Sequence, residues 1–221
     1  MLISNIYNLA DTYFVGRLGD SAQGATGILF TLQTIIQAIA FMLGHGAGVY
    51  VSKCLADKNQ KEATEYASSA FFLGAAVGSL FSIACLSLLE PLMYLLGSTD
   101  TILPHAKDYG MWILLSCPFL ICSLVLNNNL RYEGKAFFSM IGLGFGGLLN
   151  IFGDWLFVSV LGMGVFGAGL ATAVSQTISF LILLFMYRKM AQSKIHIKYM
   201  TDEAVETLKS NTNTVTENLI K

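Results

Sequence analysis

Leu-Asn-Ile-Phe-Gly-Asp-Trp-Leu-Phe-Val-Ser-Val-Leu-Gly-Met-Gly-Val-Phe-Gly-Ala occupies residues 149–168, within a run (136–187) whose only charged residue is Asp154. Such a run is too long for one membrane-spanning helix, which needs about 20 residues. Glycines 162, 164 and 167 interrupt it as a tight turn between helices does. The stretch therefore predicts two apolar helices joined by a short turn, near 137–161 and 166–188, with one carboxylate inside the first.

The composition of the whole chain agrees with a membrane protein. Of 221 residues, 54% are hydrophobic and 12% are charged, and the mean hydropathy is +0.62. A soluble domain carries about 25% charged residues, and this length allows about five to seven spans. The net charge of −1 excludes nucleic acid as a partner. Walker A, G-x-S-x-G and H-E-x-x-H motifs are missing, so we expect neither an enzyme nor an ATP-driven pump.

Charge-free runs mark the other helices. These runs cover residues 21–52, 66–89 and 109–130, and the first 16 residues are also largely apolar. We expect an all-α integral membrane domain over residues 1–200, followed by a polar cytoplasmic tail at 201–221. Its six transmembrane helices are predicted near 1–16, 25–52, 66–96, 107–131, 137–161 and 166–188.

The basic residues predict the orientation. With six spans, eleven Lys and Arg residues fall on the side of both termini, and only Arg17 and Lys107 fall on the other side. Loops that remain in the cytoplasm carry the excess of Lys and Arg. Both termini are therefore predicted to be cytoplasmic.

The chain also contains an internal repeat. A shift of 143 residues places 11–35 on 154–178, with ten of the 25 positions identical. The repeat pairs Asp11 with Asp154 and Gln33 with Gln176. The helical hairpin at the start is therefore predicted to resemble the one at the end.

Asp11 and Asp154 are the candidate functional residues. A carboxylate at membrane depth costs several kcal/mol unless it is compensated, and none of the predicted spans contains a Lys or Arg to pair with it. A proton, Na⁺ or a cationic substrate remains as the counter-charge. Asn150 lies four residues before Asp154, and Thr172 is expected on the neighbouring helix; their oxygens suit Na⁺ or a hydrogen-bonded proton.

Three further residues are candidate accessories to this site. Asn8 lies three residues before Asp11, and Gln176 is the second of the two repeated glutamines. Pro118 falls inside the predicted helix 107–131 and should kink it. The sequence does not distinguish whether a kink at Pro118 takes part in gating or is a static bend.

Several of these segments resemble one known family. Four segments resemble, in order, motifs of the multidrug and toxic compound extrusion (MATE) family of secondary transporters. They are Asn8-Leu-Ala-Asp-Thr-Tyr-Phe-Val-Gly-Arg-Leu-Gly19, Gly44-His-Gly-Ala-Gly-Val-Tyr-Val-Ser-Lys53, Leu130-Arg-Tyr-Glu-Gly-Lys135 and Leu149–Ala168. Tyr132 and Glu133 depart from the family pattern, which usually has small or amide residues there.

The resemblance implies a fold and an activity. Family members have two six-helix lobes and export organic cations and amphipathic drugs across the plasma (inner) membrane in exchange for Na⁺ or H⁺. The resemblance carries the cation site of the N-terminal lobe over to Asp11, Asn150, Asp154 and Thr172. No further cofactor is expected.

The chain resembles the N-terminal lobe alone. We therefore expect a truncated or half-size antiporter, with a second six-helix lobe or a second copy of the chain as a candidate partner beside membrane lipid. Two alternatives stay open, a lipid-linked oligosaccharide flippase of the same superfamily and a non-functional fragment. The flippase is disfavoured because it would need basic residues in its cavity to hold a pyrophosphate.

Overall fold

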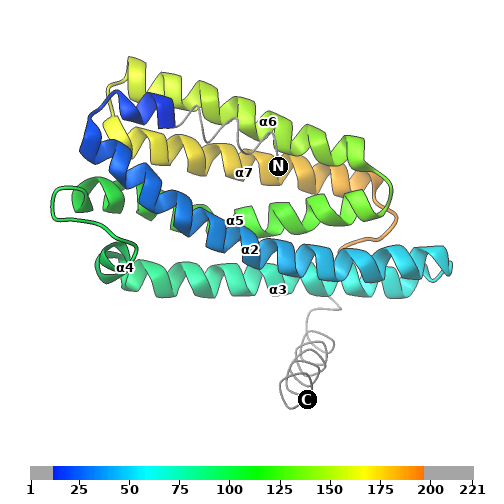
Figure 1. Ribbon diagram of the computed structural model, residues 1–221. Coiled ribbons are helices and arrows are strands. Elements are labelled where there is room, and N and C mark those ends of the chain that lie inside the picture. The colour runs from blue at the N-terminus through cyan, green and yellow to red at the C-terminus, as the bar shows by residue number, and fades with distance from the viewer. Residues whose placement is uncertain (1–11, 197–221) are drawn as a thin grey trace, which may run out of the picture.

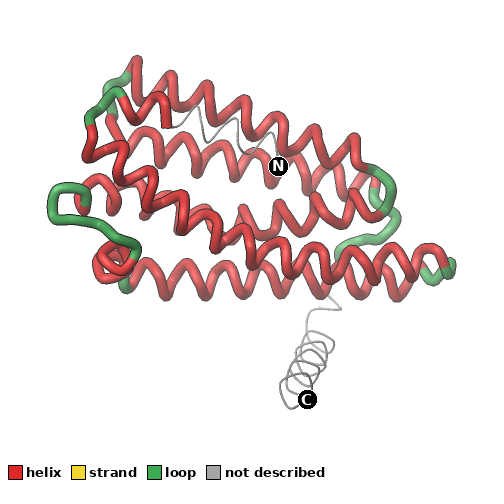
Figure 2. Tube along the Cα trace, viewed as in Figure 1, coloured by secondary structure: helices red, strands yellow, loops and turns green. Residues whose placement is uncertain are grey.

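The computed structural model describes residues 12–196, and every regular element in this range is helical. Asp11, Asn8 and the predicted tail at 201–221 lie outside the described residues. After a helical stretch at 12–16, the elements are α2 (Asp20–Ala56), α3 (Gln60–Ser87), α4 (Leu89–Leu95), α5 (Leu103–Tyr132), α6 (Ala136–Asp154), a π-helix η1 (Trp155–Val160) and α7 (Gly164–Met190). The long helices run side by side, and the loops gather at the two ends of the bundle (Figures 1 and 2).

The prediction of an all-helical membrane fold is confirmed for the described residues. Five helical segments there are long and apolar enough to cross a membrane: α2, α3, α5, α6 with η1, and α7. The first predicted span lies mostly outside this range, so a sixth span stays a prediction. The observed helices extend beyond the charge-free runs because backbone hydrogen bonding continues into the charged ends.

The predicted helix 66–96 is divided in the structure. α3 ends at Ser87, Leu88 has φ −118° and ψ 31°, and the short α4 follows. Pro91 explains the break, because a proline ring clashes with the carbonyl group four residues earlier, which here belongs to Ser87. α4 is seen nearly end-on in Figure 1, so it runs across the direction of the long helices. We call this end of the bundle the α4 end.

α5 is the central helix, and most of its apolar stretch is buried, in contrast to the other four spans. Pro118 lies in its middle, packed against α3 so closely that a Cβ added to Gly78 would lie 2.9 Å from the proline Cα. Proline has no N–H to donate to the carbonyl oxygen of Leu114. The Ser82 hydroxyl donates to that oxygen instead, at 2.6 Å. These contacts favour a static, packed role for Pro118.

The second helices of the two repeated hairpins have similar places in the fold. α2 and α7, the second helix of each hairpin, both pack against α5. Gly19 and Gly162, which the repeat pairs, have φ values of 120° and 65° in the turns that precede these helices. Such positive φ values favour glycine because it has no Cβ. Within the described residues, the repeat therefore corresponds to two helices, each preceded by a glycine turn, that pack on the same central helix.

A buried carboxylate organises the end of the bundle opposite α4. The Glu133 side chain is fully buried and accepts hydrogen bonds from the Gln192 N–H at 2.6 Å, from the Ser193 N–H at 3.2 Å and from the Ser193 hydroxyl. The Lys135 ammonium lies 3.1 Å from the same carboxylate. On α3, the Ser68 hydroxyl donates to the carbonyl oxygen of Lys194 at 3.1 Å. The departure of Glu133 from the family pattern therefore has a structural role, which is to hold the segment that follows α7.

Candidate cation site

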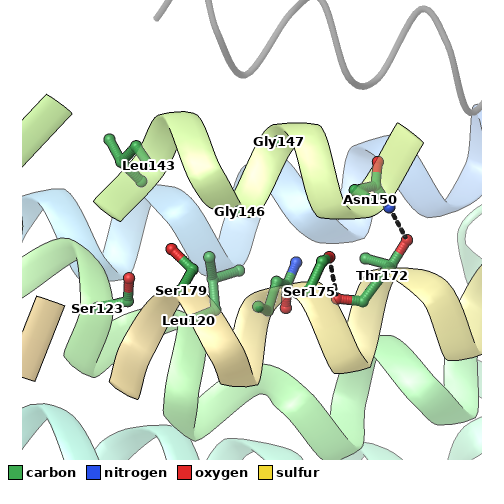
Figure 3. Close-up of a pocket in the computed structure, with 10 residues that line it drawn as sticks. Leu120, Ser123, Leu143, Gly146, Gly147, Asn150, Thr172, Ser175 and Ser179 are labelled. Carbon is green, nitrogen blue, oxygen red and sulfur yellow. Dashed lines mark hydrogen bonds between the residues drawn. The ribbon is translucent and has the colours of Figure 1, made fainter. Parts of the chain in front are cut away.

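The structure brings Asn150 of α6 and Thr172 of α7 into contact. The Asn150 side-chain amide donates a hydrogen bond to the Thr172 hydroxyl oxygen at 3.1 Å (Figure 3). Both side chains are buried, and so is Asp154, one helical turn after Asn150. The two helices can approach here because residue 153 is glycine; a Cβ at this position would lie 2.9 Å from that of Ala171. Asn150 and Thr172 thus meet at the interface between α6 and α7, and the buried Asp154 lies one turn further along α6.

Tyr109 of α5 joins this group and was not among the predicted site residues. Its hydroxyl lies 3.3 Å from the Thr172 hydroxyl, and its side chain is only 3% exposed. Tyr109 carries no signal of its own in the sequence, because it directly follows the charged Asp108 and no local pattern indicates which helices pack together. Three helices, α5, α6 and α7, therefore meet at Thr172.

Asp154 also marks a change in helix geometry. It is the last residue of α6, and η1 continues the helix with wider, π-type turns, as in the 2.9 Å bond from the Leu161 N–H to the Leu156 carbonyl oxygen. Short π-helical segments occur frequently at functional sites. The predicted helix 137–161 is thus one continuous rod with two hydrogen-bonding patterns.

A small pocket of about 40 Å³ adjoins the Asn150–Thr172 contact, between α5, α6 and α7 (Figure 3). Gln176 lines it together with Asn150 and Thr172, and the side-chain oxygen of Gln176 accepts a hydrogen bond from Ser116 at 2.8 Å. By volume the pocket holds roughly three water-sized groups. Pro118 does not line this pocket.

The donor atoms available here are hard oxygens. The Asn150 side-chain oxygen is buried and has no hydrogen-bond partner within residues 12–196. The fully buried Asp154 follows four residues later on the same helix. Amide, carboxylate and hydroxyl oxygens are of the kind that suits Na⁺ or a proton held by hydrogen bonds.

Comparison with known proteins identifies the family. The sequence profile of the MatE family matches residues 1–156, which is more than half of the chain. The chain belongs to the MATE family. The match includes the Asn150 and Asp154 segment of this MATE chain and ends before Thr172.

Curated relatives of this MATE chain include multidrug export proteins. MepA of Staphylococcus saprophyticus is 28% identical over 190 residues, and MepA of Staphylococcus aureus strain MRSA252 is 29% identical over 189 residues. Each match covers 85% of this chain but 42% of the relative. The chain thus spans less than half the length of these relatives.

Solved MATE structures share the fold of the chain. A MATE in the bent conformation matches with a TM-score of 0.85 at 26% identity, covering 90% of this chain and 45% of the other. An outward-facing MATE family transporter of the MOP superfamily matches with 0.83 at 27% identity, covering 91% and 45%. An inward-facing one matches with 0.82 at 27% identity, covering 90% and 46%.

Proposed function

We propose that this chain forms one lobe of a cation-coupled exporter of organic cations and amphipathic drugs in the plasma membrane. The observation that carries the proposal is the buried Asp154, one helical turn after the Asn150 that bonds to Thr172, in a member of the MATE family. A buried carboxylate in a membrane helix marks an ion or substrate pathway by default. The names of the MepA relatives support drugs as the exported substrates.

The α4 end is proposed to face the outside. The last turns of α2, α5 and α7 at the opposite end carry Lys53, Arg131, Arg188 and Lys189. The positive-inside rule places such residues in the cytoplasm, which leaves the α4 end outside. The candidate site then lies in the outer half of the membrane, since Thr172 is only eight residues from the start of α7 at Gly164.

Coupling requires that the ion bind two conformations of the transporter unequally. Na⁺ or H⁺ would neutralise Asp154 and hold α5, α6 and α7 together through Tyr109, Asn150 and Thr172. An organic cation would compete for the same negative charge. Similar TM-scores to outward-facing and inward-facing transporters support a lobe that moves largely as one body.

A second lobe is part of the proposal because the chain spans 42% of the MepA relatives. It would be a second six-helix lobe or a second copy of this chain. The lipid-linked oligosaccharide flippase is less well supported. Such a flippase would need Lys or Arg side chains in its cavity to bind a pyrophosphate, and the basic residues of α2, α5 and α7 lie toward the ends of the described spans.

Ion binding is tested first, because it does not depend on a second lobe. The thermal unfolding of the purified chain in detergent is followed while NaCl replaces choline chloride, and separately while pH is varied. An ion at 100 times its dissociation constant stabilises the folded state by about 2.7 kcal/mol. We expect Asp154→Asn to abolish this stabilisation and Asp20→Asn, at an exposed position at the start of α2, to preserve it.

Transport is then measured in proteoliposomes as efflux of a cationic dye driven by a Na⁺ or pH gradient. Asp154→Asn should stop gradient-driven efflux, whereas Asp20→Asn should leave it intact. Unchanged ion stabilisation and unchanged efflux in Asp154→Asn would refute the proposed coupling site. The gradient that drives efflux identifies the ion.

A further inference from the structure

A second cavity lies between α2 and α5. This cavity, which we call the α2–α5 groove, has a volume of about 300 Å³ and is lined by polar groups of Gln23, Thr26, Gln33 and Tyr109, with Phe30 and Ile113 as apolar walls. Gln23 and Phe30 are exposed, so one side of the groove is open. A polar space of this size holds many waters. The described residues that line it are all uncharged.

Tyr109 connects the groove to the candidate cation site. The tyrosine lines the groove, and its hydroxyl lies 3.3 Å from the Thr172 hydroxyl, which accepts from Asn150 at 3.1 Å. The groove and the pocket of about 40 Å³ beside Asn150 are thus linked through the Tyr109–Thr172 contact. Gln23 and Tyr109 lie near the starts of α2 and α5, so the groove occupies the half of the bundle toward the α4 end.

The internal repeat gives the two cavities a common origin. Gln33 lines the groove, and its repeat partner Gln176 lines the pocket beside the cation site. Their helices, α2 and α7, both pack on α5. The groove therefore corresponds, through the repeat, to the pocket beside the candidate site, with a glutamine kept at the same place.

We propose that the α2–α5 groove is an access site for a hydrated monovalent cation on its way to Asp154. Amide and hydroxyl oxygens such as those of Gln23, Thr26 and Gln33 replace part of the water around a cation and hold it weakly enough for it to move on. Tyr109 is a positioning residue between the groove and the site. This inference rests on the proposed function, because it assumes that Asp154 binds the ion.

The two tryptophans provide a kinetic readout. Trp155 directly follows Asp154, and Trp112 packs against Phe166, with ring centroids 5.4 Å apart. We would mix the full-length chain rapidly with NaCl, or jump the pH, and follow the tryptophan fluorescence. The rate constant reports access, and the amplitude at different ion concentrations reports affinity.

The test variant is Thr26→Val with Gln33→Leu, which makes the groove apolar. The matched control is Thr34→Val with Gln37→Leu, on residues of the same helix that do not line the groove. Thr34 donates to a main-chain carbonyl of its own helix, as Thr26 does, so the two variants lose the same kind of hydrogen bond.

We expect the test variant to slow the fluorescence change about tenfold while the half-saturating ion concentration stays the same, because closing a route slows binding and release alike. The control should keep the wild-type rate. An unchanged rate in the test variant, or a changed affinity at an unchanged rate, would overturn the access role and leave the proposed function intact. If wild type and Asp154→Asn both fail to respond to the ion, the proposed function itself fails, and this inference falls with it.

Discussion

Ser82→Ala is expected to destabilise the protein only while residue 118 is proline. In the wild type the Ser82 hydroxyl is 2.6 Å from the Leu114 carbonyl oxygen, which Pro118 leaves without its usual helical donor. A buried acceptor that loses its partner costs about 1–3 kcal/mol, and hydrogen bonds between membrane helices measure about 0.6 kcal/mol on average and about 1.7 at most. We therefore expect Ser82→Ala to lower the free energy of unfolding by about 1–1.5 kcal/mol.

The same substitution in a Pro118→Ala background should cost much less. Alanine restores an N–H at position 118, which can donate to the Leu114 oxygen within α5. The difference between the two costs is the coupling energy, and we expect about 1 kcal/mol. Unfolding of the detergent-solubilised chain in increasing sodium dodecyl sulfate, followed by tryptophan fluorescence, measures all four proteins of the cycle.

Ser79→Ala is the control for this cycle. The Ser79 hydroxyl donates to Ala75 within its own exposed helix turn, at 2.8 Å, so its removal should cost less than about 0.5 kcal/mol in either background. If Ser82→Ala lowers the free energy of unfolding equally with proline and with alanine at position 118, the Ser82 hydroxyl does not replace the donor that Pro118 lacks. Gradient-driven efflux that survives Pro118→Ala would further support a static role for the proline over a gating role.

Three other substitutions probe the two ends and the middle of the lobe. Glu133→Gln removes the charge from a set of hydrogen bonds worth about 1.5–3 kcal/mol. The segment after α7 should then open more often, and tryptic cleavage after Lys194 should become about tenfold faster. An unchanged cleavage rate would contradict the role of Glu133 in holding this segment. Gly153→Ala forces α6 away from α7, so it should lower the free energy of unfolding by about 1–3 kcal/mol and weaken ion binding. Gly144→Ala, on the same helix, is the control, because a Cβ at residue 144 would have no atom within 4 Å. Equal unfolding midpoints of the two variants would refute the close approach at Gly153. Tyr109→Phe keeps the ring but removes the hydroxyl, so ion-induced thermal stabilisation should fall by about 0.5–1.5 kcal/mol, and a full wild-type response would exclude a part in binding.

The long helices could be predicted because membrane burial leaves a strong signal in one sequence. Runs without Lys, Arg, Asp or Glu located all five described spans to within six residues at the ends, and Asp154 stood out as the one charged residue in its run. The contact between Asn150 and Thr172 also followed, since a tight turn makes α6 and α7 neighbours. The ion-binding role of these residues remains a prediction.

The features that could not be predicted depend on contacts between distant segments or on small energy differences. Pro91 carried the signal for the break after α3, yet the apolar run continues through it and suggested one helix. Tyr109 reaches Thr172 only because α5 lies at the centre of the bundle, which no single-chain pattern states. The choice between α- and π-type turns after Asp154 leaves no mark in the pattern of apolar residues.

The π-helix η1 shows how two copies of one hairpin came to differ. The repeat places residues 155–160 on 12–17 without an insertion or a deletion, and residues 12–16 are α-helical whereas 155–160 are π-helical. Both copies keep the glycine turn that follows, at Gly19 and Gly162. Two segments paired by the repeat thus differ in winding with no difference in the number of residues. The different winding changes the angular spacing of side chains along the helix, so residues that the repeat pairs point in different directions after Asp154.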